Sequence, residues 1–325
     1  MQRGLILCLI ALFAVAALIG SVAVGSVSIP AGELLAAFSG KASGPVADIV
    51  WKLRLPRVAA GFACGGLLAL AGTLLQVLLR NPLADPYIFG VSGGAALGVL
   101  LAMLLGFGAA IQSGLGLAGA IGASAAVFLL SFRGGEWNPY RLLLTGVVIA
   151  AGLNAALSLI LVLAPHTAVK GMLYWLMGDL GYAGNPVPAL LVLAVLLAVI
   201  LPLARMLNVL ALGRTKALSL GVPVAGMEIL LYVLAAVATV TAVLVGGTIG
   251  FIGLIVPHLV RLLGLADHRW LLPASVLAGG SLLVVADAFA RSLWAPLQFP
   301  VGVLTALLGV PVLLLLLAGR SDAAR

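Results

Sequence analysis

Long runs without a charged residue alternate with short charged segments along the whole chain. A membrane-spanning helix needs about 20 predominantly apolar residues. We therefore expect a helix in each long run, and two helices wherever a run is too long for one. The charge-free runs are 4–32, 58–79, 86–132, 142–169, 180–204, 229–260, 270–286 and 292–319.

Two of these runs are predicted to be divided. The 47-residue run 86–132 is expected to form a helical hairpin that turns between Gly106 and Gly114. The 32-residue run 229–260 is expected to break at Gly246-Gly247, giving a full span and a shorter helix that ends near Arg261. The division predicts an all-α polytopic membrane protein with about ten spans in a single domain, residues 1–325, and both termini on one side. The first run exceeds the apolar core of a signal peptide, so we expect it to be retained.

The composition excludes several classes of protein. Hydrophobic residues make up 64% of the chain and charged residues only 8%, whereas a soluble domain has about 25% charged residues. A cytosolic enzyme, a secreted domain and a nucleic-acid binder are therefore excluded, although the net charge is +8. Cys8 and Cys64 both lie in apolar runs and offer neither a disulfide framework nor a zinc site.

The basic residues favour a cytoplasmic N-terminus. This orientation places six basic residues outside, and four of them (Lys41, Lys52, Arg54 and Arg57) lie in the single segment 41–57. Basic residues are usually depleted on the external side of a membrane protein. This cluster therefore indicates either an acidic external partner or anchoring of a helix end among lipid head groups. The eleven basic residues on the cytoplasmic side are Arg3, Arg80, Arg133, Arg141, Arg205, Arg214, Lys216, Arg261, Arg269, Arg320 and Arg325.

The chain offers no site for chemistry. It has no Walker A pattern, and its G-x-G-x-x-G match, Gly114–Gly119, follows no strand, so we expect those glycines to serve helix packing. Three histidines without a carboxylate cluster predict no metal site, no catalytic residue and no cofactor in this chain. Asp287 and Arg291 are four residues apart and are expected to pair. The energy source must therefore lie in another chain.

The segment 205–223 is the longest predicted cytoplasmic loop. Gly213 breaks it and Gly221 is placed to end its last turn as a C-cap. We expect two short helices at a right angle to the spans, too short to be stable alone. Such a knob either enters a groove of a partner protein or lies along the membrane interface.

Several blocks of sequence, in order and at regular spacing, resemble the permease subunits of ABC importers for iron–siderophores, haem and cobalamin, the FecCD type. The resemblance covers nearly the whole chain, and no single block would carry it. The blocks are Arg54-Leu-Pro-Arg57, Gly72-Thr-Leu-Leu-Gln76, Asn81-Pro-Leu-Ala-Asp85-Pro86, Gly90-Val-Ser-Gly-Gly-Ala95, Tyr174-Trp-Leu-Met-Gly178, 212–222, 250–261, Asp267-His268-Arg269, 286–291 and 300–311.

The resemblance implies a type II ABC importer permease fold in the plasma (inner) membrane. It also implies a homodimer, two ATPase chains that carry ATP–Mg below, and an external substrate-binding protein above. Arg54, Arg57 and Arg291 correspond to arginines that dock the binding protein. The pathway would be lined by spans 140–164 and 300–319, with candidate residues Thr145, Asn154, Ser158 and Thr305. The coupling residues would be Gly213, Arg214, Thr215, Lys216, Ala217, Leu218, Ser219, Leu220 and Gly221.

From the residues alone, Asn154 and Ser158 share a helix face and serve either an interhelical hydrogen bond or a neutral wall for a large solute. Two positions depart from the family pattern. Gln298-Phe299 stands where the family usually has Glu-Leu, which removes a carboxylate at the outer mouth. Arg214 stands where an acidic residue is usual, which indicates a matching change in the ATPase groove.

The sequence thus favours the membrane subunit of an ATP-driven importer that moves a large metal chelate by alternating access. Haem is one candidate cargo, which His166 in an outer loop would reach, although a lone loop histidine is usually only solvated. The rival hypotheses are an ion-gradient-driven secondary transporter and a non-transporting membrane scaffold.

Overall fold

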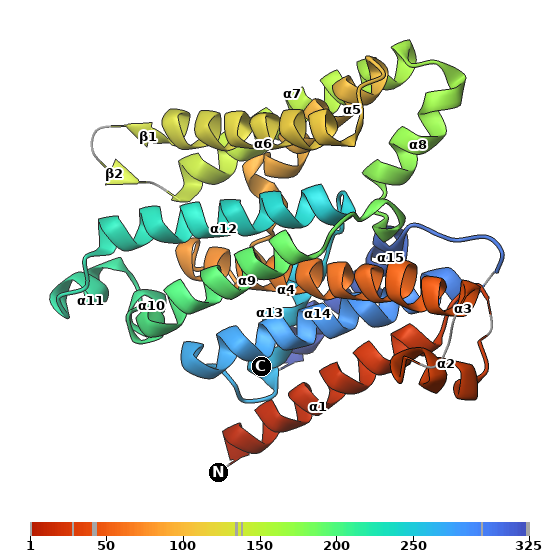
Figure 1. Ribbon diagram of the computed structural model, residues 1–325. Helices are drawn as coiled ribbons and strands as arrows, with labels where there is room; N and C mark the ends of the chain where they lie inside the picture. Colours follow the sequence, from red (N-terminus) through yellow and green to blue (C-terminus); the bar gives the residue numbers. More distant parts are fainter. Residues whose placement is uncertain are drawn as a thin grey trace.

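The computed structural model is a bundle of helices that run roughly side by side (Figure 1). It describes residues 2–27, 29–40, 44–133, 136–137, 139–293 and 295–322. The short antiparallel pair of β1 (Phe132–Arg133) and β2 (Glu136–Trp137) joins two of the helices. The helices are α1 (Gln2–Ala23), α2 (Ala31–Phe38), α3 (Pro45–Asp48), the π-helical turn η1 (Ile49–Arg54), α4 (Leu55–Leu78), η2 (Pro86–Phe89), α5 (Val91–Leu104), α6 (Ala109–Ser131), α7 (Pro139–Leu163), α8 (His166–Leu176), η3 (Leu180–Tyr182), α9 (Val187–Ile200), η4 (Leu201–Leu203), α10 (Ala204–Ala211), α11 (Arg214–Ser219), α12 (Val224–Gly246), α13 (Ile252–Leu262), α14 (His268–Ser292) and α15 (Val301–Asp322).

Among the described residues, seven helical stretches are long and apolar enough to cross a membrane. Three shorter apolar helices, α5, α13 and the first part of α15, add to them. Each of these ten stretches coincides with one expected span, while the number that crosses a bilayer remains a prediction. We call the end of the bundle that carries α10 and α11 the α11 end, and the opposite end, with α2, α3 and α8, the α2 end (Figure 1).

The breaks predicted from glycine are mostly confirmed. Helix α12 ends at Gly246, and Gly247 follows with φ +69 before α13 begins at Ile252. The hairpin turn lies at the early edge of the predicted segment, because Gly106 has φ +72 and α6 starts at Ala109. The fifth predicted span is shorter than its charge-free run, since α7 ends at Leu163 and a separate helix, α8, starts after Pro165. A proline favours the first turn of a new helix over the interior of an old one.

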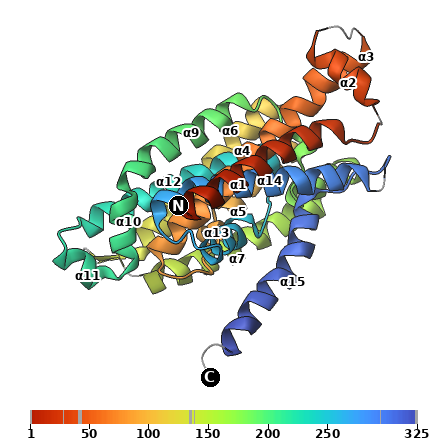
Figure 2. The same cartoon turned by 90° about the horizontal axis from the view of Figure 1, so that it is seen from below.

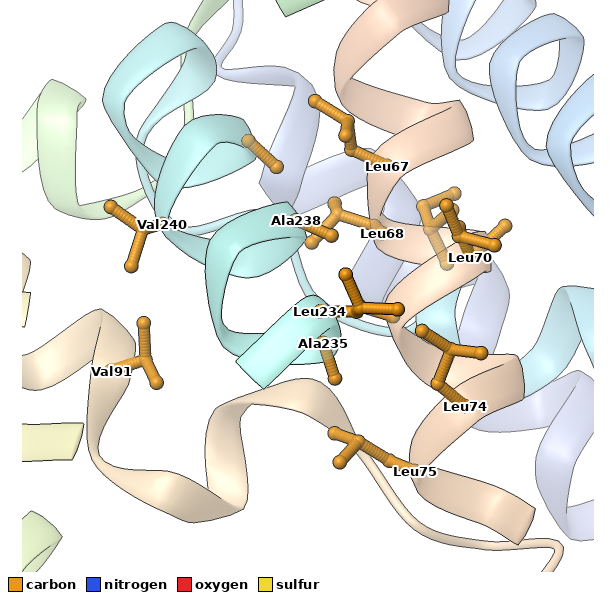
Figure 3. Packing of buried hydrophobic residues seen from close by; sticks show 14 of the residues in the cluster. Leu67, Leu68, Leu70, Leu74, Leu75, Val91, Leu234, Ala235, Ala238 and Val240 are labelled. Atoms are coloured by element: carbon orange, nitrogen blue, oxygen red, sulfur yellow. The ribbon is translucent and has the colours of Figure 1, made fainter. Parts of the chain in front are cut away.

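Helix α4 is the centre of the molecule. Nineteen of its 24 residues are buried, and it packs against α12, α13 and α14. Figure 3 shows Leu67, Leu68 and Leu74 of α4 beside Leu234 and Ala235 of α12. Within a bilayer such contacts gain little from the hydrophobic effect, because lipid is as apolar as leucine. Close van der Waals packing must therefore stabilise the bundle.

Glycine provides that close packing. A Cβ atom at Gly72 would lie 1.8 Å from the carbonyl oxygen of Gly253 in α13, and one at Gly65 would lie 2.3 Å from that of Gly279 in α14. In the α5–α6 hairpin, a Cβ atom at Gly119 would lie 2.1 Å from the carbonyl oxygen of Gly94. Gly116 and Gly119 of the G-x-G-x-x-G match thus belong to a helix contact, as predicted, whereas a Cβ atom at Gly114 would meet nothing within 4 Å.

Candidate functional sites at the two ends of the bundle

Arg57 is the hub of a charge cluster at the α2 end. Its guanidinium makes a forked contact with Asp287 of α14, with Nε at 3.1 Å and Nη2 at 2.9 Å from Oδ1. The same group lies 3.5 Å from Asp179, just before η3, and donates to Oε1 of Gln298 at 3.1 Å. Arg57 therefore joins α4, α14 and two connecting loops that are far apart in sequence.

Arg54 is the last residue of the π-helical turn η1, and its side chain points to the end of α1. Its Nη1 donates to the carbonyl oxygens of Val22 and Ala23, both at 2.9 Å, and its Nη2 donates to that of Val27. The last carbonyl groups of a helix lack partners within the helix and attract cations. Arg54 is 5% exposed and thus caps α1.

Arg291 is also buried and ties α14 to α1. It lies 2.9 Å from Asp287, which confirms the predicted pair, and it donates to the carbonyl and hydroxyl oxygens of Ser21 at 3.1 and 2.9 Å. Of the three arginines predicted to dock a partner, Arg57 keeps the most accessible guanidinium, with 14% of its side chain exposed. Docking by all three remains a prediction.

The cluster carries an unbalanced positive charge. Three guanidinium groups share two carboxylates, Asp179 and Asp287, because position 298 offers a neutral amide. Burial raises the pKa of Asp179, although the backbone N–H of Gly181 and the charge of Arg57 oppose that shift. A cavity of about 550 Å³ opens beside these groups, lined in part by Lys52, Arg54, Arg57, Arg291 and Gln298.

The α11 end carries the predicted pair of short helices. Helix α10 ends at Ala211, Gly213 has φ +115, and α11 spans only six residues. Gly221, with φ +79, closes α11 through two bonds: its N–H donates to the carbonyl of Leu218 at 3.0 Å, and that of Val222 donates to Ala217 at 3.0 Å. This is the Schellman pattern, which confirms the predicted glycine cap.

Most of the elbow from Leu212 to Gly221 is exposed. Leu212, Leu218 and Leu220 are 60%, 55% and 64% exposed, whereas Ala217 is buried. Arg214 is held within the chain, 3.2 Å from Glu228 of α12, and Arg80 lies 3.6 Å from the same carboxylate. The basic residue at position 214 thus has an acidic partner inside this chain.

The predicted pathway residues lie on α7 and α15. Asn154 and Ser158 are exposed on one face of α7, where the Ser158 hydroxyl donates to the backbone oxygen of Asn154 at 2.9 Å. Thr145 is half-buried. Thr305 is buried, and its hydroxyl donates to Gly302 at 3.0 Å. Asn154 and Ser158 are therefore accessible on the surface of this chain, whereas Thr305 is not.

Sequence reasoning missed Asp179 and the partners of Arg54. The Asp-x-Gly pattern before η3 was the available signal for Asp179, since an aspartate there accepts from the N–H two residues on. No pattern in the sequence pointed to the carbonyl groups of α1. Among the described residues, no group of three or more metal-ligating side chains is present.

The structure is thus a bundle of apolar helices with an exposed elbow at one end and a charged cavity at the other, as expected of a multi-pass membrane protein. A profile of the FecCD transport family matches residues 10–319. The chain belongs to this family. Membership of this family implies a transport role as a permease.

Relatives of known role match over most of the chain. The hemin transport system permease HmuU of Yersinia pestis is 42% identical over 287 residues, which cover 85% of this chain and 86% of that protein. The vitamin B12 import permease BtuC of Klebsiella pneumoniae is 38% identical over 301 residues, covering 91% and 88%. An inward-facing metal-chelate-type ABC transporter superposes with a TM-score of 0.84 at 30% identity, covering 97% of this chain and 99% of that one.

Proposed function

We propose that this protein is the membrane-spanning subunit of an importer that carries a large metal chelate, of the haem, cobalamin or siderophore class, by alternating access. The observation that carries the proposal is the similarity to a hemin permease and a B12 permease over more than four-fifths of the chain. A bulky amphipathic cargo suits a neutral pathway, and two exposed polar side chains in the middle of α7, Asn154 and Ser158, carry no charge.

A second copy of the chain would complete the pathway. Figure 2 shows α15 leaving the bundle, and it exposes Leu307, Leu308 and Leu315 by 65%, 63% and 73%. Val147 and Val148 on α7 are exposed by 59% and 63%. We expect these two helices to face their counterparts in a homodimer, with the cargo passing along the dimer axis.

The elbow at residues 212–221 is the proposed contact for the ATPase chains. Its exposed leucines supply an apolar surface on and beside the six-residue helix α11, which a groove of a partner protein would cover. We expect this end and both termini in the cytoplasm, because basic residues are in excess at the α11 end. The cavity beside Arg57 would then face the binding protein, and its unbalanced positive charge would attract an acidic side chain.

Reconstitution tests the transport function. Liposomes that hold this chain, its ATPase and a binding protein should accumulate haem or cobalamin only when ATP is enclosed. Replacing residues 213–221 by a flexible glycine–serine linker should abolish both uptake and co-purification of the ATPase. Uptake by the chain alone, driven by an ion gradient, would identify a secondary transporter, and no uptake with all partners present would favour a scaffold.

A charge substitution tests the docking surface. Arg57→Gln should weaken binding of the external protein, because it removes the most accessible charge of the cluster. Lys170→Gln is the matched control, since Lys170 carries the same charge on α8 at the same end of the bundle, is exposed and does not line the cavity. Equal affinities of both variants at moderate salt would remove Arg57 from the docking surface.

A further inference from the structure

A second polar cavity, of about 330 Å³, lies at the α11 end, apart from the cluster around Arg57. It is enclosed by the ends of α4, α10, α13 and α14, and its lining includes Gln76, Arg80, Arg261 and His268. The transport proposal uses none of these four residues. Because they lie where helices end, we expect the cavity to be at the depth of lipid head groups.

His268 presents an unused nitrogen. The Oδ1 atom of Asn208 accepts from the backbone N–H of His268 at 2.9 Å and lies 2.6 Å from its Nδ1, while Nδ2 of Asn208 donates to Asp267 at 2.8 Å. This network assigns the proton to Nδ1 and leaves a lone pair on Nε2. Nε2 is buried, and within the described part of the chain it has no hydrogen-bond partner. A ligand with a hydroxyl group would satisfy it.

The arginines give the cavity a positive charge. Arg261 donates to Oε1 of Gln76, and among the described residues no carboxylate pairs with it. Arg80 lies 3.6 Å from Glu228, a distance beyond hydrogen bonding, and Glu228 is already paired with Arg214. Arg80, Arg214 and Arg261 thus have one carboxylate, Glu228, among them, and this partly exposed excess of positive charge favours an anionic ligand.

The rim of the cavity is apolar and faces outward. Leu262 lines it and is 62% exposed, and Ala211 and Ala266 on the rim are exposed as well. Such a rim suits the start of an acyl chain better than it suits water. Basic pockets between transmembrane helices, close to the membrane surface, are typical sites for the head groups of anionic lipids.

We infer that this cavity binds the head group of an anionic phospholipid that also carries a hydroxyl, as phosphatidylglycerol does. The phosphate oxygens accept from Arg80 and Arg261, the glycerol hydroxyl donates to Nε2 of His268, and an acyl chain leaves over Leu262. None of these ligating residues belongs to the elbow or to the cluster around Arg57, although Arg80 shares Glu228 with Arg214 of the elbow.

Native mass spectrometry of the full-length protein, delipidated and then titrated with defined lipids, tests this inference. Phosphatidylglycerol should bind more tightly than phosphatidylcholine, which has neither net charge nor a hydroxyl. Arg80→Gln should weaken phosphatidylglycerol binding about fivefold, the share of one basic side chain at a membrane surface. Arg205→Gln removes the same charge from an exposed position at the same end and should not change binding.

A second variant guards against loss of the fold. Ala266→Trp fills the mouth of the cavity without removing a charge, and Ala225→Trp places the same side chain at an exposed position nearby, outside the cavity. Only Ala266→Trp should reduce phosphatidylglycerol binding, with unchanged elution in size exclusion. Equal binding of phosphatidylglycerol by the wild type, Arg80→Gln and Ala266→Trp would overturn the inference. Binding of inorganic phosphate with the same dependence on Arg80, without binding of phosphatidylglycerol, would overturn the lipid assignment.

Discussion

Asp287 holds two buried guanidinium groups at the α2 end. It is 1% exposed, and it faces Arg57 from α4 and Arg291 from its own helix, each at 2.9 Å. A buried ion pair adds little net stability over an apolar pair, but removal of one partner leaves a charge without compensation. The carboxylate is therefore needed even if the cluster as a whole is nearly neutral in its effect on folding.

We expect Asp287→Asn to destabilise the protein by about 3–5 kcal/mol, because two buried arginines then share no carboxylate on α14. Thermal unfolding in detergent measures the effect. Asp48→Asn is the control, since Asp48 pairs with Lys52 at the surface with 61% and 72% of the two side chains exposed; such a pair contributes at most about 1 kcal/mol. Similar losses in both variants would contradict the assigned role of Asp287.

Asp267 gives the protein an acid-sensitive contact at the α11 end. Side-chain hydrogen bonds from Arg269, helped by Asn208 and the Arg269 N–H, hold the pKa of Asp267 well below its usual range. A depressed carboxyl pKa stabilises the folded state above the unfolded pKa of about 3.9, and this contribution is lost as the pH falls through the folded value.

Asp267→Asn keeps an N-cap side chain for α14 and removes only the charge. We expect the variant to be about 1 kcal/mol less stable than the wild type at neutral pH. The difference in melting temperature should shrink as the pH is lowered below about 4. A difference that stays constant down to about pH 3 would show that the carboxylate charge is not involved.

At the scale of single elements, the elbow depends on its glycines. Helix α11 has six residues and no side-chain N-cap, so its geometry comes from Gly213 before it and Gly221 after it, both with positive φ. Positive φ is easily reached only by glycine. The elbow therefore has a defined shape before any partner binds.

Gly221→Ala should destabilise the elbow by about 1–2 kcal/mol, because a Cβ atom is strained in the left-handed region. The expected result is weaker co-purification of the ATPase chain, while the helical bundle remains folded. Gly226→Ala is the matched control: Gly226 lies in α12 with no atom within 4 Å of a Cβ there, and alanine suits a helix better than glycine. If Gly221→Ala binds the ATPase as well as the wild type does, the glycine cap is not needed for that contact.

At the scale of the whole molecule, contacts between helix backbones hold the bundle together. Gly72 lies where α4 meets α13, so any side chain there forces the two helices apart. Gly122 of α6 has open space around it. Substituting these two glycines by alanine therefore tests whether close contact between helix backbones stabilises the fold.

Gly72→Ala should lower the free energy of unfolding by about 1–3 kcal/mol through overpacking. Gly122→Ala should be neutral or slightly stabilising, because its Cβ atom meets nothing and alanine is the better helix former. Melting temperatures in the same detergent compare the two. Equal stability of both variants would show that α4 and α13 can separate without loss.

The helices could be predicted from the sequence because a spanning segment must be apolar over a fixed length. The Asp287–Arg291 pair could be predicted as well, since the two side chains are one helical turn apart. Helices α2 and α8 could not be predicted from the charge-free runs. Each is too short to span a membrane, and each follows a longer apolar helix in the sequence.

The sequence by itself determined the class of protein, the order of the helices, the breaks at Gly213 and Gly246-Gly247, and the family. Each of these follows from local composition, local conformation or a match along the chain. Only the tertiary structure decided that Arg54 caps α1, that Arg57 binds Asp287, 230 positions away, and that Arg214 binds Glu228. Charge signs along a chain do not determine which opposite charges meet, because that depends on how the helices pack.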